Sequence, residues 1–102
     1  MAYLRLADVL LFRGDREDAR ENLKIAFEKK DKLIEYDWLR LKALMARINF
    51  KPIEERQYIG RLKEAFPFKK EYHYDFAESY FHHGDAEEAI KHYKKALEAL
   101  SP

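Results

Sequence analysis

The chain has 102 residues, enough for one continuous hydrophobic core but too few for two independent domains. Its 20 basic and 19 acidic residues nearly cancel, so it lacks the concentrated positive charge that nucleic-acid binding requires. It has no cysteine and no threonine, one valine, three glycines and three prolines, which excludes disulfides and thiolate metal ligands and indicates a mainly helical fold.

The first two predicted helices flank a Gly-Asp pair. The apolar stripe before the pair has helical spacing and predicts a helix over about residues 2–13; it consists of Leu4, Ala7, Leu10 and Leu11. Gly14 ends this helix, because glycine readily takes the left-handed conformation of a helix C-terminus. Asp15 is the expected N-cap of a second helix, about residues 15–29, with Asp18 in a weak capping-box position. The stripe of that helix consists of Ala19, Leu23, Ala26 and Phe27.

The next two helices are bounded by prolines. A third stripe begins at Leu33 or Tyr36 and continues through Trp38, Leu41, Leu44, Met45 and Ile48. A fourth helix begins at Pro52, whose fixed φ suits a first helical turn, and ends before Pro67, because a residue that precedes proline avoids helical geometry. Its inward residues are expected to be Ile59, Leu62 and Phe66.

The last two helices repeat the pattern of the first two. A fifth helix with the stripe Phe76, Ala77, Tyr80 and Phe81 ends at Gly84. Asp85 with Glu88 forms a better capping box for a sixth helix. The sequence therefore predicts an all-α fold of six helices.

The helix pairs recur with a period of 35 residues. The pairs Gly14-Asp15 and Gly84-Asp85 are 70 residues apart, and single steps of 35 connect Tyr3, Trp38 and His73, and also Pro67 and Pro102. We therefore expect one domain over residues 1–102, made of three helix pairs at about 1–33, 34–67 and 68–102.

This pattern resembles the tetratricopeptide repeat family. Repeat one reads Tyr3-x2-Leu6-Ala7-x2-Leu10, then Ala19-x3-Leu23-x2-Ala26, and repeat three reads His73-x2-Phe76-Ala77-x2-Tyr80, then Ala89-x3-Tyr93-x2-Ala96, followed by Ser101-Pro102. Small residues are expected where adjacent helices approach closely. The resemblance implies tandem helix-turn-helix units that form a right-handed α-solenoid segment.

The middle unit departs from the family pattern. Trp38, Leu41 and Met45 agree with it, but Lys42 and Glu55 stand where small residues belong. Asn49-Phe50-Lys51-Pro52 replaces Gly-Asp, so we expect a longer or reoriented turn that affects the packing of the fourth helix.

Catalytic and cofactor chemistry has little support in the sequence. Ser79 and Ser101 are the serines, and neither lies in a nucleophile motif. His82 and His83 point about 100° apart on a helix and do not ligate one metal easily. Asp75 and Glu78 share a helical face, which is usually a solvated one. We therefore expect no enzyme activity, no cofactor and no metal.

Membrane association is also not expected. Arg5 and Asp8 interrupt the apolar N-terminal stretch, and no run approaches the ~18 apolar residues of a membrane span. The absence of cysteine is compatible with the cytoplasm, where we expect this protein.

The family resemblance implies that the first helix of each pair lines a concave groove that binds a peptide or a segment of a partner protein. The face expected to line it comprises Leu4, Asp8, Leu11 and Phe12, then Leu39, Arg40, Ala43 and Arg47, then Tyr74, Asp75, Glu78, Phe81 and His82. Leu4, Leu11, Phe12 and Phe81 are expected to form an exposed apolar patch, although Phe12 and Phe81 suit a core position equally well. Arg40 and Arg47 are expected to be exposed.

Two features narrow the kind of partner. Some family members grip a C-terminal carboxylate with basic and amide side chains. Only Arg40 fits that role among the matching positions, which are Leu4, Asp8, Arg40, Glu71 and Asp75. A partner with apolar anchors and some positive charge is therefore favoured. The alternative function is a structural or self-associating segment of a longer helical-repeat protein, with weak homo-oligomer formation through an uncapped sixth helix. The apolar surface of that helix comprises Ala89, Ile90, Tyr93, Ala96, Leu97 and Leu100.

Overall fold

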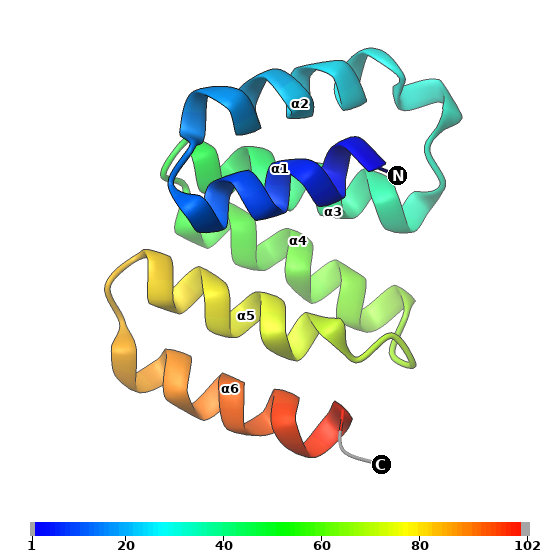
Figure 1. Ribbon diagram of the computed structural model, residues 1–102. Coiled ribbons are helices and arrows are strands. Elements are labelled where there is room, and N and C mark those ends of the chain that lie inside the picture. Colours follow the sequence, from blue (N-terminus) through cyan, green and yellow to red (C-terminus); the bar gives the residue numbers. More distant parts are fainter. Residues whose placement is uncertain (1, 101–102) are drawn as a thin grey trace.

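The computed structural model describes residues 2–100 and shows six α-helices in three antiparallel pairs (Figure 1). No strand occurs within this range. The helices are α1 Ala2–Arg13, α2 Arg16–Glu28, α3 Glu35–Ile48, α4 Pro52–Ala65, α5 Glu71–His82 and α6 Ala86–Leu100. A short 3-10 helix, Lys30–Lys32, joins α2 to α3 and was not expected from the sequence. The all-α architecture and the tandem helix pairs are confirmed.

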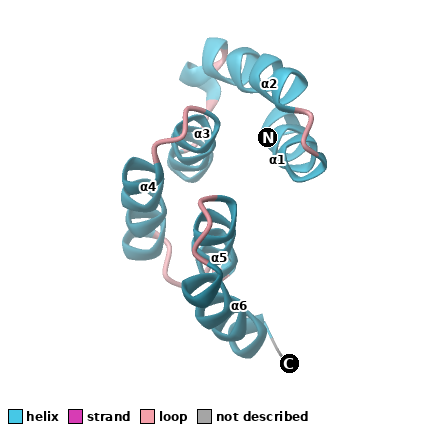
Figure 2. Cartoon of the chain, turned by 90° about the vertical axis from the view of Figure 1, so that its left-hand side faces the viewer, coloured by secondary structure: helices cyan, strands magenta, loops and turns pink. Residues whose placement is uncertain are grey.

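The first helices of the pairs lie on one side of the array and the second helices on the other. Figure 2 shows α1, α3 and α5 on the inside of an arc, with α2, α4 and α6 outside them. Each pair packs against the next through α2 on α3 and α4 on α5. The inner helices therefore present one continuous face, on which a binding surface is expected.

All three pairs use the same turn between their helices. Gly14 and Gly84 have φ near +87° and +84°, and Phe50 takes the same left-handed conformation at +55°. The amide after each of these residues donates to a carbonyl of the last helical turn, as in a Schellman motif. These bonds are Asp15 to Leu10 at 2.8 Å, Lys51 to Ala46 at 2.9 Å and Asp85 to Tyr80 at 2.8 Å. The expected reorientation of the middle turn was wrong, because Phe50 supplies the conformation that glycine supplies elsewhere.

The common turn sets the alignment of the middle pair. Counted from the left-handed residue, the small residues Ala7 and Ala77 lie seven positions earlier, and so does Ala43. Lys42 therefore does not occupy the close-contact position that the 35-residue step assigned to it. Instead its ammonium lies 5.4 Å from the centre of the Trp38 ring. The first helix of the middle pair is one residue longer before its turn, which displaces the alignment by one.

The same count confirms that Glu55 replaces a small residue. Ala19 and Ala89 lie five positions after their turns and are buried, and Glu55 lies five positions after Phe50 and is fully buried. A carboxylate inside a helix contact needs partners of opposite charge or hydrogen-bond donors.

The helix N-termini differ in how they are capped. The backbone N–H of Glu88 donates to Asp85 Oδ1 at 3.2 Å, so Asp85 caps α6. The Glu88 carboxylate contacts Lys91 instead of returning to the Asp85 amide, so the capping box is only half formed. Asp15 makes no such side-chain bond, and its carboxylate pairs with Arg13 at 2.8 Å. Pro52 lies in the first turn of α4, as expected.

Two apolar clusters form the core. The larger joins the first pair to α3 and contains Leu4, Ala7, Leu11, Ala19, Leu23, Ala26, Leu41, Leu44 and Ile48. The smaller joins the second pair to α5 through Ala43, Ile59 and Tyr72. Much of the remaining contact between the second and third pairs is polar, and these polar contacts reach the inner face of the array. Ser101-Pro102, which the sequence comparison used, lies outside the described residues.

Candidate partner-binding groove

A hollow of about 350 Å³ opens between the inner helices α1, α3 and α5. Its lining comprises Leu4, Arg5, Asp8, Tyr36, Asp37, Arg40, Lys69, Glu71, Tyr74 and Asp75. These residues come from all three pairs, so the hollow exists only because the pairs stack. Its lining is mainly polar, with the rings of Tyr36 and Tyr74 as its aromatic part.

Arg40 connects the three inner helices at the floor of this hollow. Its Nη1 donates to Asp75 Oδ2 at 2.7 Å, and its Nη2 lies 3.7 Å from Asp8 Oδ2. Burial alone would lower the pKa of Arg40, but the Asp75 carboxylate outweighs burial and raises that pKa above its ordinary value. Arg40 therefore stays charged, and its charge is paired with the carboxylates of Asp75 and Asp8.

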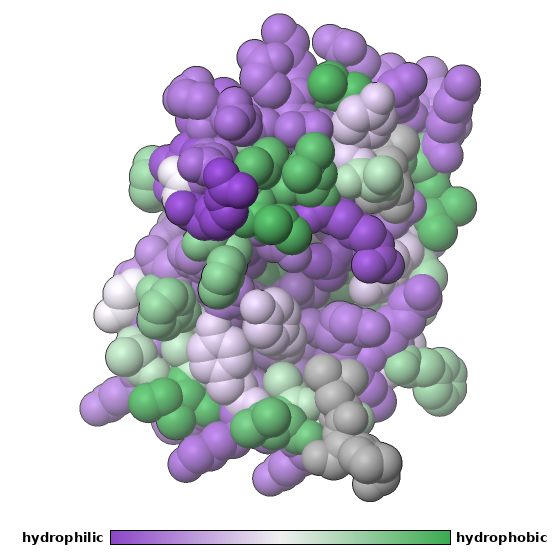
Figure 3. Space-filling model, in the orientation of Figure 1, coloured by the Kyte–Doolittle hydropathy of each residue, from purple (hydrophilic) through white to green (hydrophobic). Residues whose placement is uncertain are grey.

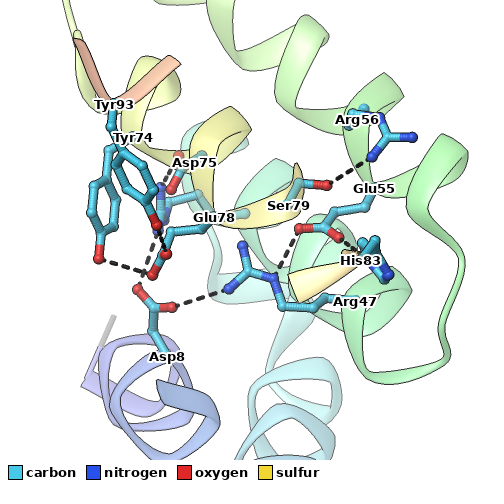
Figure 4. Close-up of polar contacts among 11 residues, drawn as sticks. Asp8, Arg47, Glu55, Arg56, Tyr74, Asp75, Glu78, Ser79, His83 and Tyr93 are labelled. Atoms are coloured by element: carbon cyan, nitrogen blue, oxygen red, sulfur yellow. Dashed lines mark hydrogen bonds and ion pairs between the residues drawn. The ribbon is translucent and has the colours of Figure 1, made fainter. Parts of the chain in front are cut away.

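Arg47 lies further along α3 and connects α1 to α4. Its Nε donates to Glu55 Oε2 at 2.9 Å, and its Nη1 lies 3.7 Å from Asp8 Oδ1. The second oxygen of Glu55 lies 3.1 Å from Nε2 of His83, at the end of α5 (Figure 4). The buried Glu55 carboxylate thus has one partner in its own pair and one in the next, which ties the second pair to the third.

Glu78 accepts hydrogen bonds from two tyrosines. The Tyr74 hydroxyl donates to Glu78 Oε1 at 2.9 Å, and the Tyr93 hydroxyl of α6 donates to Glu78 Oε2 (Figure 4). Burial raises the pKa of Tyr74 to about 12, and its hydrogen bond to the carboxylate adds to this shift. The pKa of Tyr93 is raised for the same reasons. Both phenols therefore stay protonated and act as donors.

Several residues expected on an exposed groove face are buried. Leu4 and Leu11 lie in the larger core cluster, together with residues of α2 and α3. The expected apolar patch that included them is wrong. Leu39, Ala43 and Arg47 are also buried: Leu39 lies on the side of α3 that faces α4, Ala43 packs with Ile59 of α4 and Tyr72 of α5, and Arg47 is paired with Glu55 of α4. Asp75 and Glu78 are buried as acceptors of the internal hydrogen bonds described above.

Other expected groove residues are accessible. Phe12 is 73% exposed and Phe81 is 60% exposed, so neither is a core residue. Tyr74 and His82 are exposed as well, and Asp8 and Arg40 are half-buried. Of the four residues proposed for the apolar patch, the two phenylalanines remain at the surface.

Sequence reasoning missed the partners of the buried Glu55 carboxylate. Glu55 was identified as a misfit in a small-residue position, but Arg47 and His83 were not recognised as its partners. The signal was available in the turn, because counting from Phe50 aligns Arg47 with Leu11 of the first pair and Glu55 with Ala19. Opposite charges at two core positions that are apolar in the first pair indicate an ion pair. Tyr93, expected on the apolar surface of the sixth helix, supplies the second donor to Glu78.

Comparison with known proteins supports the family resemblance. Residues 70–100, which span the third helix pair, match the family model described as tetratricopeptide repeat. No curated protein and no solved structure matches the chain. The described fold is a tandem array of helix pairs, consistent with a tetratricopeptide-like helical repeat. Repeats of this family are in general non-enzymatic modules for protein–protein interaction.

Two further features concern the described residues alone. Between residues 2 and 100, no helix has both the length and the apolar character needed to cross a membrane. The same range holds no cluster of three or more histidine or carboxylate side chains placed to hold a metal ion.

Proposed function

We propose that this protein is an interaction module that binds an extended partner segment across the face formed by α1, α3 and α5. The observation that supports this best is a hollow of about 350 Å³ between these helices, flanked by accessible aromatic side chains on α1 and α5. Concave sites lined by aromatic residues are the usual form of a binding surface.

Helical spacing places the aromatic side chains along this face. Tyr74 lines the hollow, and Phe81 lies seven residues later on the same side of α5. Phe12 lies four residues after Asp8, which lines the hollow from α1. Exposed aromatic rings at an interface contribute much of the binding energy. We therefore assign Tyr74, Phe81 and Phe12 as the apolar anchors.

The polar floor favours a partner that needs no compensating charge. Arg40 is paired with Asp75, Arg47 with Glu55, and Glu78 accepts from two phenols. A partner carboxylate would compete with Asp75 for Arg40, so a carboxylate-gripping mode is disfavoured. A partner cation gains little from Asp75, which is paired with Arg40, or from Glu78, both of whose oxygens accept from phenols. The preferred partner is a segment with aromatic or aliphatic anchors.

Selection of a displayed random peptide library for binding to the immobilised protein tests this proposal. The selected peptides should share apolar anchors, and Phe81→Ala should weaken their binding at least about tenfold, as expected for a central aromatic contact. Phe68→Ala is the matched control, because Phe68 is 92% exposed in the loop between α4 and α5. Binding that Phe68→Ala lowers as much as Phe81→Ala would contradict the assignment.

Salt dependence separates apolar anchoring from charge pairing. Binding that rests on apolar anchors should change less than about threefold between low and moderate salt, whereas exposed ion pairs are screened. A loss of affinity of an order of magnitude or more would show that charged groups of the floor pair with the partner, against the proposal.

A further inference from the structure

Arg56 of α4 contacts the first helix of the next pair. Arg56 lies six residues after the left-handed Phe50, and its Nη1 donates to Ser79 Oγ of α5 at 3.4 Å. Its guanidinium also lies 4.4 Å from the centre of the Tyr80 ring. Ser79 in turn lies five residues before the left-handed Gly84. The contact between α4 and α5 thus joins the sixth residue after the left-handed residue of one pair to the fifth residue before the left-handed residue of the next pair.

The first junction uses the same two positions. Arg20 lies six residues after Gly14, and Met45 lies five residues before Phe50. Both line one hollow between α2 and α3, together with Leu23 and Phe27 of α2 and Ile48 of α3. Both junctions therefore place these two positions between neighbouring pairs, in direct contact at the second junction and along one hollow at the first.

The two ends of the array carry these positions with apolar side chains. Ile90 lies six residues after Gly84 on α6 and is 53% exposed. Val9 lies five residues before Gly14 on α1 and is 57% exposed. Figure 3 shows apolar residues gathered over α1 and again along α6. Each end therefore presents its half of the junction that the molecule makes twice internally.

We propose that the outer face of α6 in one copy of this chain packs on α1 of a second copy, with Ile90 against Val9. The occupant is a second copy because the interface continues the α2–α3 and α4–α5 junctions by the same rule of position. The two surfaces differ, so the contact is heterologous and propagates head to tail. This association uses the ends of the array and leaves the face of α1, α3 and α5 for the partner proposed above.

Sedimentation equilibrium tests the proposal. The average mass of the unaltered chain should rise above the 12.3 kDa of the monomer between about 10 and about 500 micromolar. Ile90→Glu and Val9→Glu should each remain monomeric over this range. Ile53→Glu is the matched control, because Ile53 is exposed and lies three residues after Phe50, where the other pairs have Glu17 and Glu87. It should associate like the unaltered chain.

Mixing the two variants identifies the geometry. Ile90→Glu keeps an intact α1 face and Val9→Glu keeps an intact α6 face, so an equimolar mixture should form dimers and nothing larger. That complementation also shows that both variants are folded. A strictly monomeric unaltered chain would overturn the proposal, and so would dimers of Val9→Glu alone, which would indicate a symmetric contact between two α6 helices.

Discussion

Arg47 and Glu55 form a buried ion pair, 2.9 Å from Nε to Oε2, at the two positions where the first helix pair has Leu11 and Ala19. Both side chains are almost completely removed from solvent. Breaking such a pair leaves one buried charge without compensation, whereas replacing both charges with apolar residues is often neutral. The middle pair has therefore exchanged an apolar contact for an electrostatic one.

Arg47→Leu alone should lower the free energy of unfolding by about 3–5 kcal/mol, because Glu55 would remain buried with His83 as its remaining partner. Arg47→Leu combined with Glu55→Ala copies the first pair, and its stability should lie within about 1 kcal/mol of the unaltered protein. Urea unfolding of the two single variants and the double variant measures this. Additive losses in the double variant would show that the two residues are not coupled.

The fold was largely predictable because most helix boundaries are marked by glycine and proline in the local sequence. Gly14 and Gly84 end α1 and α5, Pro52 begins α4, and Pro67 follows its end, as the residues themselves indicate. The middle turn was not predictable in the same way. A phenylalanine rarely has positive φ, so Phe50 gave no local signal, and the alignment of α3 was displaced by one residue.

The site was less predictable because burial depends on neighbouring pairs. Leu4 and Leu11 belong both to the apolar stripe of their helix and to the expected groove face, and they lie in the core cluster that α1, α2 and α3 form together. Arg47 is buried in an ion pair with Glu55, which lies on the other side of the turn. The correspondence of Arg47 with Leu11 of the first pair becomes visible only when the middle pair is aligned at Phe50. Phe12 and Phe81 were placed on the groove face, and their accessibility agrees with that placement.

Phe50→Gly should be more stable than Phe50→Ala by about 1 kcal/mol. Both variants lose the contact of the Phe50 ring with the Arg16 guanidinium, which lies 4.1 Å from the ring centre. They differ in the cost of the left-handed conformation, which is small for glycine and about 1–2 kcal/mol for other residues. Thermal or urea unfolding of the two variants measures the difference. Equal stability would show that position 50 does not hold this conformation in solution.

Ala89→Leu should lower the free energy of unfolding by about 1–3 kcal/mol, because Ala89 is buried in the position of closest helix contact. Ala86→Leu provides the matched control, since Ala86 lies on the same helix and is exposed. Thermal melts should show a clear loss for the first variant and little change for the second. Equal midpoints would contradict the alignment of Ala89 with Ala19 and Glu55.

Stability should fall as the pH drops below about 6.5, the ordinary pKa of histidine. Burial lowers the pKa of His92, which stacks on Tyr80 with ring centres 5.2 Å apart and contacts Phe76. Below pH 6.5 the unfolded chain therefore binds more protons than the folded protein, and stability is lost until the folded-state pKa is passed. His92→Phe keeps a ring in the stack and should flatten this part of the pH profile. Unfolding curves of both proteins at pH 5.5 and pH 7.5 measure the effect, since these values lie about one unit below and above the ordinary histidine pKa of 6.5. Parallel losses would assign the pH dependence to other groups.

Amide chemical-shift mapping by NMR, with a peptide selected by display, locates the bound segment on the protein. Binding across the inner face should shift amides of α1, α3 and α5 near Phe12, Arg40, Tyr74 and Phe81, and should leave α2 and α4 largely unchanged. Shifts concentrated on the outer helices, with the inner face unaffected, would contradict the proposed groove.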